Sequence, residues 1–362
     1  MSELPHAFLA PQIKGCIRRQ PADFFVREEL SFEPGDGGEH VWLFIRKTEW
    51  NTTDLALWLA KAARISLKAV GYSGLKDRRA VTEQWFSLHL PGKPDPVWEA
   101  LPTGVEILKT CRHTRKLNRG THRFNYFSIA LTALELGDSS ESALNDRLTE
   151  IARRGVPNYF GEQRFGRDKG NWQRGGEWLR GEGEAPRKAQ LKSFWLSAVR
   201  SGIFNAVLAE RVRRDCWDKP LVGDICQPDG SRGLFNQLDE PACAERMAAG
   251  EVHPTAPMPG TGGLLPQQDS AELEQQILDL FQAEIAGLQA EGVEAARRAT
   301  RLPVRDLDWV LSGDMLTLSF RLPVGSFATS VLAEILELQP LPLESFPEGA
   351  VSEVTGSESE AK

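Results

Sequence analysis

Residues 71–86 read Gly-Tyr-Ser-Gly-Leu-Lys-Asp-Arg-Arg-Ala-Val-Thr-Glu-Gln-Trp-Phe, and this stretch does most to predict the fold. Two glycines mark a turn, and the side chains of residues 81–88 alternate between two faces, as in a strand. The turn carries one acid, Asp77, among three bases, Lys76, Arg78 and Arg79. Neighbouring bases favour an ionised carboxylate, so Asp77 is a candidate nucleophile or general base. A surface turn with solvated charges is the alternative interpretation.

The composition is typical of a globular protein. A chain of 362 residues with 41% hydrophobic residues suggests two domains, at about 150 residues each. No run approaches the ~18 apolar residues of a membrane span, and we expect no secretory signal at the N-terminus. The five cysteines form no CxxC pair, and the six histidines form no HxH or HExxH pattern. These features predict a cytoplasmic protein with no membrane segment, disulfide or metal site.

The net charge of −7 argues against a nucleic-acid-binding protein, but one segment of this acidic chain is strongly basic. Residues 112–123 contain five Lys or Arg, two His and no acid, and we call them the basic segment. Clustered bases with aromatic residues nearby are typical of RNA-binding surfaces. A solvated basic loop is the alternative. The acidic tail from Leu343 onward adds to the negative total and is expected to be disordered.

The spacing of apolar residues predicts the order of the elements. Strands are expected over 14–30, 40–46, 105–109, 127–134, 307–310 and 316–322, and helices over 51–63 (with Thr53 as N-cap), 140–154 and 193–214. Residues 223–263 should form turns and short strands, and residues 270–301 mostly one long helix. This order predicts an α+β fold in which a domain of residues 155–300 is inserted into a first domain of residues 1–154 and 301–362.

Several blocks of this sequence resemble the TruD family of tRNA pseudouridine synthases. The blocks are residues 74–77 with 80–85, 156–166 and 322–331, and shorter matches are residues 21–24 and 294–299. They follow the family order and span nearly the whole chain. The resemblance implies a pseudouridine-synthase catalytic domain with a mixed, largely antiparallel sheet flanked by helices. A smaller, family-specific α/β domain would interrupt it.

The same resemblance implies roles for individual residues. Asp77 would be the essential carboxylate, and the substrate site would be lined by Phe24, Lys76, Asn125, Phe127 and Phe320. Candidate contacts to RNA are Arg18, Arg112, Arg115, Lys116, Arg119, Arg164, Arg297 and Arg298. Core packing is the alternative for the phenylalanines, and a solvated surface is the alternative for the bases. Two positions depart from the family: Phe124 stands in place of a glycine, and Arg18 in place of a common lysine.

The implied reaction is the isomerisation of uridine 13, in the D arm of tRNA, to pseudouridine. The base would be flipped out of the RNA, and Asp77 could attack the sugar or the base, or remove a sugar proton. No cofactor would be needed, because the uracil leaving group stays bound and becomes the nucleophile. The glycine-rich residues 35–38 and 260–263 lack the form of a nucleotide-binding loop, so we expect no nucleotide cofactor. We also expect a monomer. A non-catalytic RNA-binding protein and a small-molecule hydrolase are the alternatives.

Overall fold

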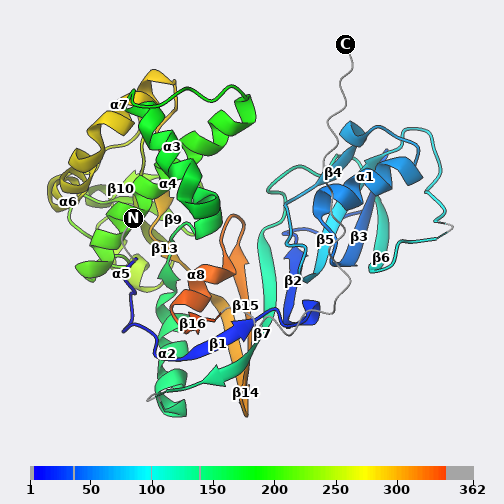
Figure 1. Ribbon diagram of the computed structural model, residues 1–362, viewed down its shortest axis with the longest axis horizontal. Coiled ribbons are helices and arrows are strands. Elements are labelled where there is room, and N and C mark those ends of the chain that lie inside the picture. Colours follow the sequence, from blue (N-terminus) through cyan, green and yellow to red (C-terminus); the bar gives the residue numbers. More distant parts are fainter. Residues whose placement is uncertain (1–3, 36, 99, 138–139, 340–362) are drawn as a thin grey trace.

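The computed structural model describes residues 4–35, 37–98, 100–137 and 140–339, so the acidic tail expected to be disordered lies outside the described residues (Figure 1). Its main sheet has ten strands, seven of them in the order β14-β15-β7-β2-β5-β3-β6. β1 pairs with β7 and β16, and β4 pairs with β5. Their bounds are β1 Lys14–Ile17, β2 Phe24–Glu29, β3 His40–Thr48, β4 Val70–Tyr72, β5 Val81–His89, β6 Val105–His113, β7 Phe124–Glu135, β14 Arg305–Ser312, β15 Met315–Pro323 and β16 Glu337–Leu338.

The main sheet is mixed and largely antiparallel, which confirms the predicted fold class. Among the described strands, β1 with β16 and β2 with β5 are the parallel pairs. Helix α1 (Thr52–Ala62) buries Leu55 and Leu59 against Leu43 and Phe86 of β3 and β5. Helices α2 (Glu141–Arg154) and α8 (Ala328–Ala333) pack on the half of the sheet that contains β7 and β15. The sheet therefore has two cores, and β2 and β5 join them.

The chain between α2 and β14 forms a second group of elements, on the left of Figure 1. A four-stranded sheet has the order β10-β9-β11-β12, and β8 pairs with β13. The strands are β8 Val156–Pro157, β9 Ile225–Pro228, β10 Phe235–Asn236, β11 Val252–Met258, β12 Ala296–Ala299 and β13 Arg301–Leu302. The helices are α3 Gly170–Leu179, α4 Ala189–Arg213, α5 Cys243–Ala248, α6 Gln268–Leu278 and α7 Gln282–Ala290.

We propose that residues 155–300 form the inserted domain. All strands of the four-stranded sheet and helices α3–α7 come from this range. Where the chain enters and leaves it, Pro157 pairs with Arg301 and Val156 with Leu302. In Figure 1, β7 and β15 stand between this group and α1 with its strands. No helix among the described residues is long and apolar enough to cross a membrane.

Two local predictions were wrong. Residues 270–301 are not one long helix, because helical structure ends at Ala290 and β12 and β13 follow. Gly292 has a φ of 70°, which turns the chain out of the helix, and β12 then pairs with β11. Helix α1 begins one residue after Asn51, so Thr53 lies inside the helix and is not its N-cap. β6 and β7 are longer than predicted, so the basic segment begins inside β6.

Candidate active site around Asp77

Asp77 lies on the loop of residues 73–80, which joins β4 to β5. Two polar side chains beneath the loop fix its backbone. The hydroxyl of Thr52 accepts a hydrogen bond from the Lys76 N–H (3.0 Å), and the Gln84 amide donates to the Gly74 carbonyl (3.2 Å). Thr52 in turn donates to Gln84 (2.9 Å), and both side chains are buried. The loop is therefore held by α1 and β5, which suits a catalytic group that needs a fixed position.

A buried lysine supports the same loop. Lys47, near the end of β3, is fully buried and donates to the carbonyl oxygens of Trp50 (2.6 Å) and Asp77 (3.3 Å). Burial and the nearby charge of Lys76 lower the pKa of Lys47 to about 8. The ammonium adds positive charge below Asp77 and fixes its main chain.

The side chain of Asp77 is 44% exposed and accepts a hydrogen bond from Arg18 (Nη2 to Oδ2, 2.5 Å). The guanidinium of Arg18 also lies over the ring of Phe24, 4.2 Å from its centroid. Arg18 has a φ of 61°, in the left-handed region that residues other than glycine rarely adopt. Its position beside Asp77 makes Arg18 a residue of the candidate site, and its contact to RNA stays a prediction.

Lys76 turns away from Asp77 and into the sheet. Its ammonium pairs with Glu28 of β2 (2.6 Å), and the side chains are 7% and 0% exposed. Glu28 also accepts the N–H of Trp85 (3.0 Å). Burial raises the pKa of Glu28, and the charge of Lys76 opposes that rise. Lys76 was expected to lie beside Asp77 and to bind substrate; here its ammonium is tied to Glu28, and Arg18 is the base beside Asp77.

His122 packs against this ion pair. Its Nδ1 forms a hydrogen bond with the hydroxyl of Ser73, which also accepts the His122 N–H. Burial and the charge of Lys76 lower the pKa of His122 to about 3, so its ring is neutral at neutral pH. A Cβ on Gly74 would lie 3.2 Å from the His122 ring, so a glycine at position 74 allows the loop to approach.

Asn125, on β7, pairs with Glu28 of β2 on one side and with Leu322 of β15 on the other. It is 9% exposed and its Oδ1 is buried. Within the part of the chain that the structure describes, this oxygen accepts no hydrogen bond of normal geometry, although the Asn125 side chain also interacts with the ring of His122. Buried polar atoms nearly always have partners, so this oxygen is suited to accept a hydrogen bond from a ligand.

The three predicted phenylalanines form one cluster in the core. Phe24, Phe127 and Phe320 are 3%, 6% and 0% exposed. The rings of Phe127 and Phe320 are stacked (5.4 Å between centroids), and Phe24 meets Phe127 edge-on (6.2 Å). No base can stack on Phe320 without displacing its neighbours, and the low exposure of Phe24 and Phe127 favours core packing for them as well. Phe24 still contributes to the site, since its ring supports Arg18.

The basic segment packs beside the Asp77 loop. The Gly120 N–H donates to the Ser73 carbonyl (2.8 Å), and Arg119 lies over the ring of Tyr72, at the end of β4. Arg115 and Arg119 are exposed, and Lys116 donates to the Lys68 carbonyl (2.6 Å). Arg112 differs: it lies in β6 and pairs with Asp95 (2.6 Å).

The predicted arginines of the second group fall into two classes. The side chain of Arg297 is 4% exposed and pairs with Glu274 (Nη1 to Oε2, 3.1 Å), so its charge is neutralised within the protein and is not available to RNA. Arg164 and Arg298 form the second class, because neither forms an ion pair with a carboxylate among the described residues.

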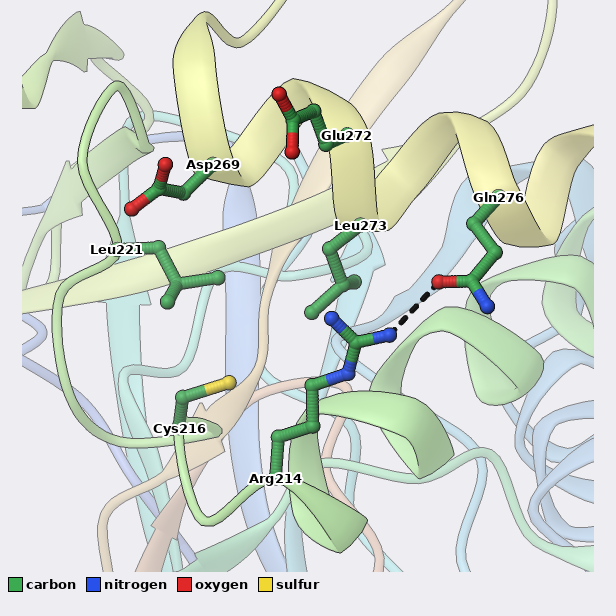
Figure 2. A pocket seen from close by; sticks show the side chains of 7 residues that line it. All are labelled: Arg214, Cys216, Leu221, Asp269, Glu272, Leu273 and Gln276. Carbon is green, nitrogen blue, oxygen red and sulfur yellow. Dashed lines mark hydrogen bonds between the residues drawn. The ribbon is translucent and has the colours of Figure 1, made fainter.

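A pocket of about 370 Å³ lies elsewhere, between the end of α4 and α6 (Figure 2). It is lined by Arg214, Cys216, Leu221, Asp269, Glu272, Leu273 and Gln276. None of these belongs to the main sheet or to the predicted site, and Arg214 donates to Gln276 across the opening. Within the described ranges, no group of three or more His, Cys, Asp or Glu is placed to hold a metal ion.

Sequence reasoning missed the inner residues of the site, namely Lys47, Glu28 and His122. The signal available for Glu28 and Lys47 was a charged residue within or next to an apolar strand pattern. Such a residue must either point outward or find a partner inside. His122 was included in the basic segment, where its neighbours suggested a solvated position.

Comparisons with known proteins agree with this architecture. The family model described as tRNA pseudouridine synthase D (TruD) matches residues 6–185 and 184–335. The tRNA pseudouridine synthase D of Aeromonas hydrophila is 40% identical over 341 residues (94% of this chain, 95% of the relative), and that of Nitrosococcus oceani is 42% identical over 335 residues (91% and 92%).

A solved structure from Methanosarcina mazei, named a putative tRNA pseudouridine synthase D, shares the fold with a TM-score of 0.73 at 21% identity. The likeness covers 92% of this chain and 95% of that one. The family model and the relatives each span most of the chain. The chain therefore belongs to the TruD family of tRNA pseudouridine synthases.

Proposed function

We propose that this protein isomerises uridine to pseudouridine in tRNA, with Asp77 as the essential carboxylate. The observation that carries the proposal is the exposed Asp77 side chain on a backbone held by Thr52, Gln84 and Lys47, in a chain of this family. The C1′–N1 bond of uridine breaks, the uracil turns within the site, and C5 bonds to C1′. C5 releases its hydrogen as a proton and N1 gains one, so no cofactor is consumed.

Asp77 acts as the nucleophile or the base of the first step, and Arg18 holds it by the 2.5 Å hydrogen bond. The unpartnered Oδ1 of Asn125 is suited to accept the N3–H of the uracil. The exposed Arg115 and Arg119, with Lys116, are positioned beside the loop to contact phosphates of the flipped nucleotide's neighbours. The protein works in the cytoplasm as a monomer.

We further propose uridine 13 in the D arm as the target, on the family resemblance. Unmodified tRNA labelled with tritium at C5 of uridine tests both parts of the proposal. Purified protein should release tritium to water without releasing uracil, and a tRNA with cytidine at position 13 should release none at that site. Binding without tritium release would favour a non-catalytic RNA-binding protein. Free uracil would indicate a hydrolase.

A further inference from the structure

We propose that Arg164, Arg298 and Arg200 form a phosphate-binding site for the RNA backbone, separate from the Asp77 loop. The inference rests on the proposed function, because it takes the ligand to be RNA. Arg164 lies on a 3₁₀ turn (Glu162–Phe165), Arg298 on β12 and Arg200 on α4. The guanidinium groups of Arg164 and Arg298 meet at the ring of Phe160, and Arg200 lies three residues along α4 from Ser197, whose hydroxyl accepts a hydrogen bond from Arg164.

The ring of Phe160 anchors two of the three. The guanidinium of Arg298 lies 4.3 Å from its centroid and that of Arg164 lies 5.2 Å from it. Phe160 is 6% exposed, and Asn205 of α4 fixes its backbone by accepting from its N–H and donating to its carbonyl (2.9 Å each). The two cations therefore lie around a rigid aromatic support, so little conformational freedom would be lost when a ligand binds.

No carboxylate neutralises these arginines among the residues that the structure describes. Arg298 donates to the side-chain oxygen of Asn158 (2.5 Å) and Arg164 to the hydroxyl of Ser197 (3.0 Å). Arg200 donates to two main-chain carbonyls, and its Nε is buried without a partner. All the acceptors are neutral, so the positive charges stay uncompensated.

A neighbouring arginine has a different electrostatic environment. Arg297, next to Arg298 in the sequence, is buried against the carboxylate of Glu274. Arg298 has no such partner, and burial together with the charge of Arg164 lowers its pKa to about 10. Like charges held together at a cost in stability mark sites built for an opposite charge. The flat, forked guanidinium matches the oxygens of a phosphate.

The site lies where the second group meets the main sheet. The hydroxyl of Ser330, on α8, donates to the Tyr159 carbonyl (3.2 Å), one residue before Phe160. Helix α8 follows β15, which pairs with β7 through Phe320 and Phe127. An RNA bound here and at the Asp77 loop would contact both portions of the protein, which would select folded tRNA over a short single strand.

Salt-dependent binding of unmodified tRNA tests the proposal. Arg164→Gln and Arg298→Gln should each weaken binding and reduce the slope of log affinity against log salt by about 0.7–0.9. Arg174→Gln is the matched control, because this exposed arginine on α3 has the nearby Gly170 carbonyl as its hydrogen-bond acceptor among the described residues; it should leave the slope unchanged.

An unchanged slope in both variants, with unchanged melting temperatures, would overturn the phosphate site. An equal loss of slope in Arg174→Gln would also overturn it, since general positive charge would then explain the effect. If Arg298→Gln unfolds, the exposed Arg164→Gln decides alone. A wild-type protein that binds tRNA with these slopes but forms no pseudouridine would refute the proposed function and leave the phosphate site supported.

Discussion

Replacing Phe127 by alanine separates core packing from base stacking in the aromatic cluster. Phe127 is 6% exposed, stacks on Phe320 and meets Phe24 edge-on. Truncation of a buried phenylalanine typically lowers the free energy of unfolding by about 3–5 kcal/mol, because apolar burial is lost and a cavity remains. At about 2.1 cal/mol/K of unfolding entropy per residue, a loss of about 4 kcal/mol lowers Tm by about 5 °C.

Thermal melts and turnover should be measured on the same samples of Phe127→Ala. We expect Phe127→Ala to have a lower Tm than wild type. Its turnover should also be lower, in part because a smaller fraction of the protein is folded. The Tm of Phe127→Leu, which leaves a smaller cavity, should lie between those of Phe127→Ala and wild type. Phe194→Ala is a surface control, since that ring is 50% exposed on α4. A wild-type melt combined with weak tRNA binding and slow turnover would refute the core interpretation and make Phe127 a stacking platform.

Three further substitutions test the buried charges. Glu28→Gln should lower the free energy of unfolding by about 3–5 kcal/mol in urea titrations, because the buried Lys76 loses its carboxylate; a change below about 1 kcal/mol would contradict this. Lys47→Met should remove the pH dependence that Lys47 gives to the free energy of unfolding. From pH 8 to 10.5 the unfolded lysine holds the proton that the folded one has lost, so stability of wild type relative to the variant should rise by about 3 kcal/mol; parallel curves would contradict it. Arg211 of α4 and Asp224 form a fully buried ion pair (2.7 Å). Arg211→Met should lower the free energy of unfolding by about 3–5 kcal/mol because Asp224 is left buried without its partner, and a second change, Asp224→Leu, should restore much of the loss in the same titrations; no recovery would contradict this.

The part of the site that is continuous in sequence was predictable. The turn before β5, its alternating strand and Asp77 follow from residues 71–88, and α1 followed from its apolar spacing. The partners of the site were not predictable. Arg18 lies 59 residues before Asp77, and Glu28 lies 48 residues before Lys76. Strand pairing brings these side chains together: Arg18 directly follows β1, which pairs with β7, and Glu28 lies on β2, which pairs with β5 and β7.

Tertiary pairing also decided the segment of residues 296–299, which was predicted wrongly as helix. Residues 296–299 form a strand because they pair with β11, although the helical spacing of apolar residues continues to Leu288, shortly before them. The same pairing turns Arg297 toward Glu274, whereas Arg298 meets Phe160. Adjacent residues of a strand point to opposite faces, so Arg297 and Arg298 do so here. The predicted helix would not have led us to expect this.

Asp77→Asn tests the central claim most directly. Asparagine keeps the shape of the side chain and an oxygen to accept the hydrogen bond from Arg18, but it is neither a nucleophile nor a base. Asp54→Asn is the matched control, because Asp54 is an exposed acid on α1 whose described partner is Asn51. Both proteins should bind tRNA and melt like wild type. Tritium release should fall by several orders of magnitude in Asp77→Asn and stay normal in Asp54→Asn; substantial release by a folded Asp77→Asn would contradict the account.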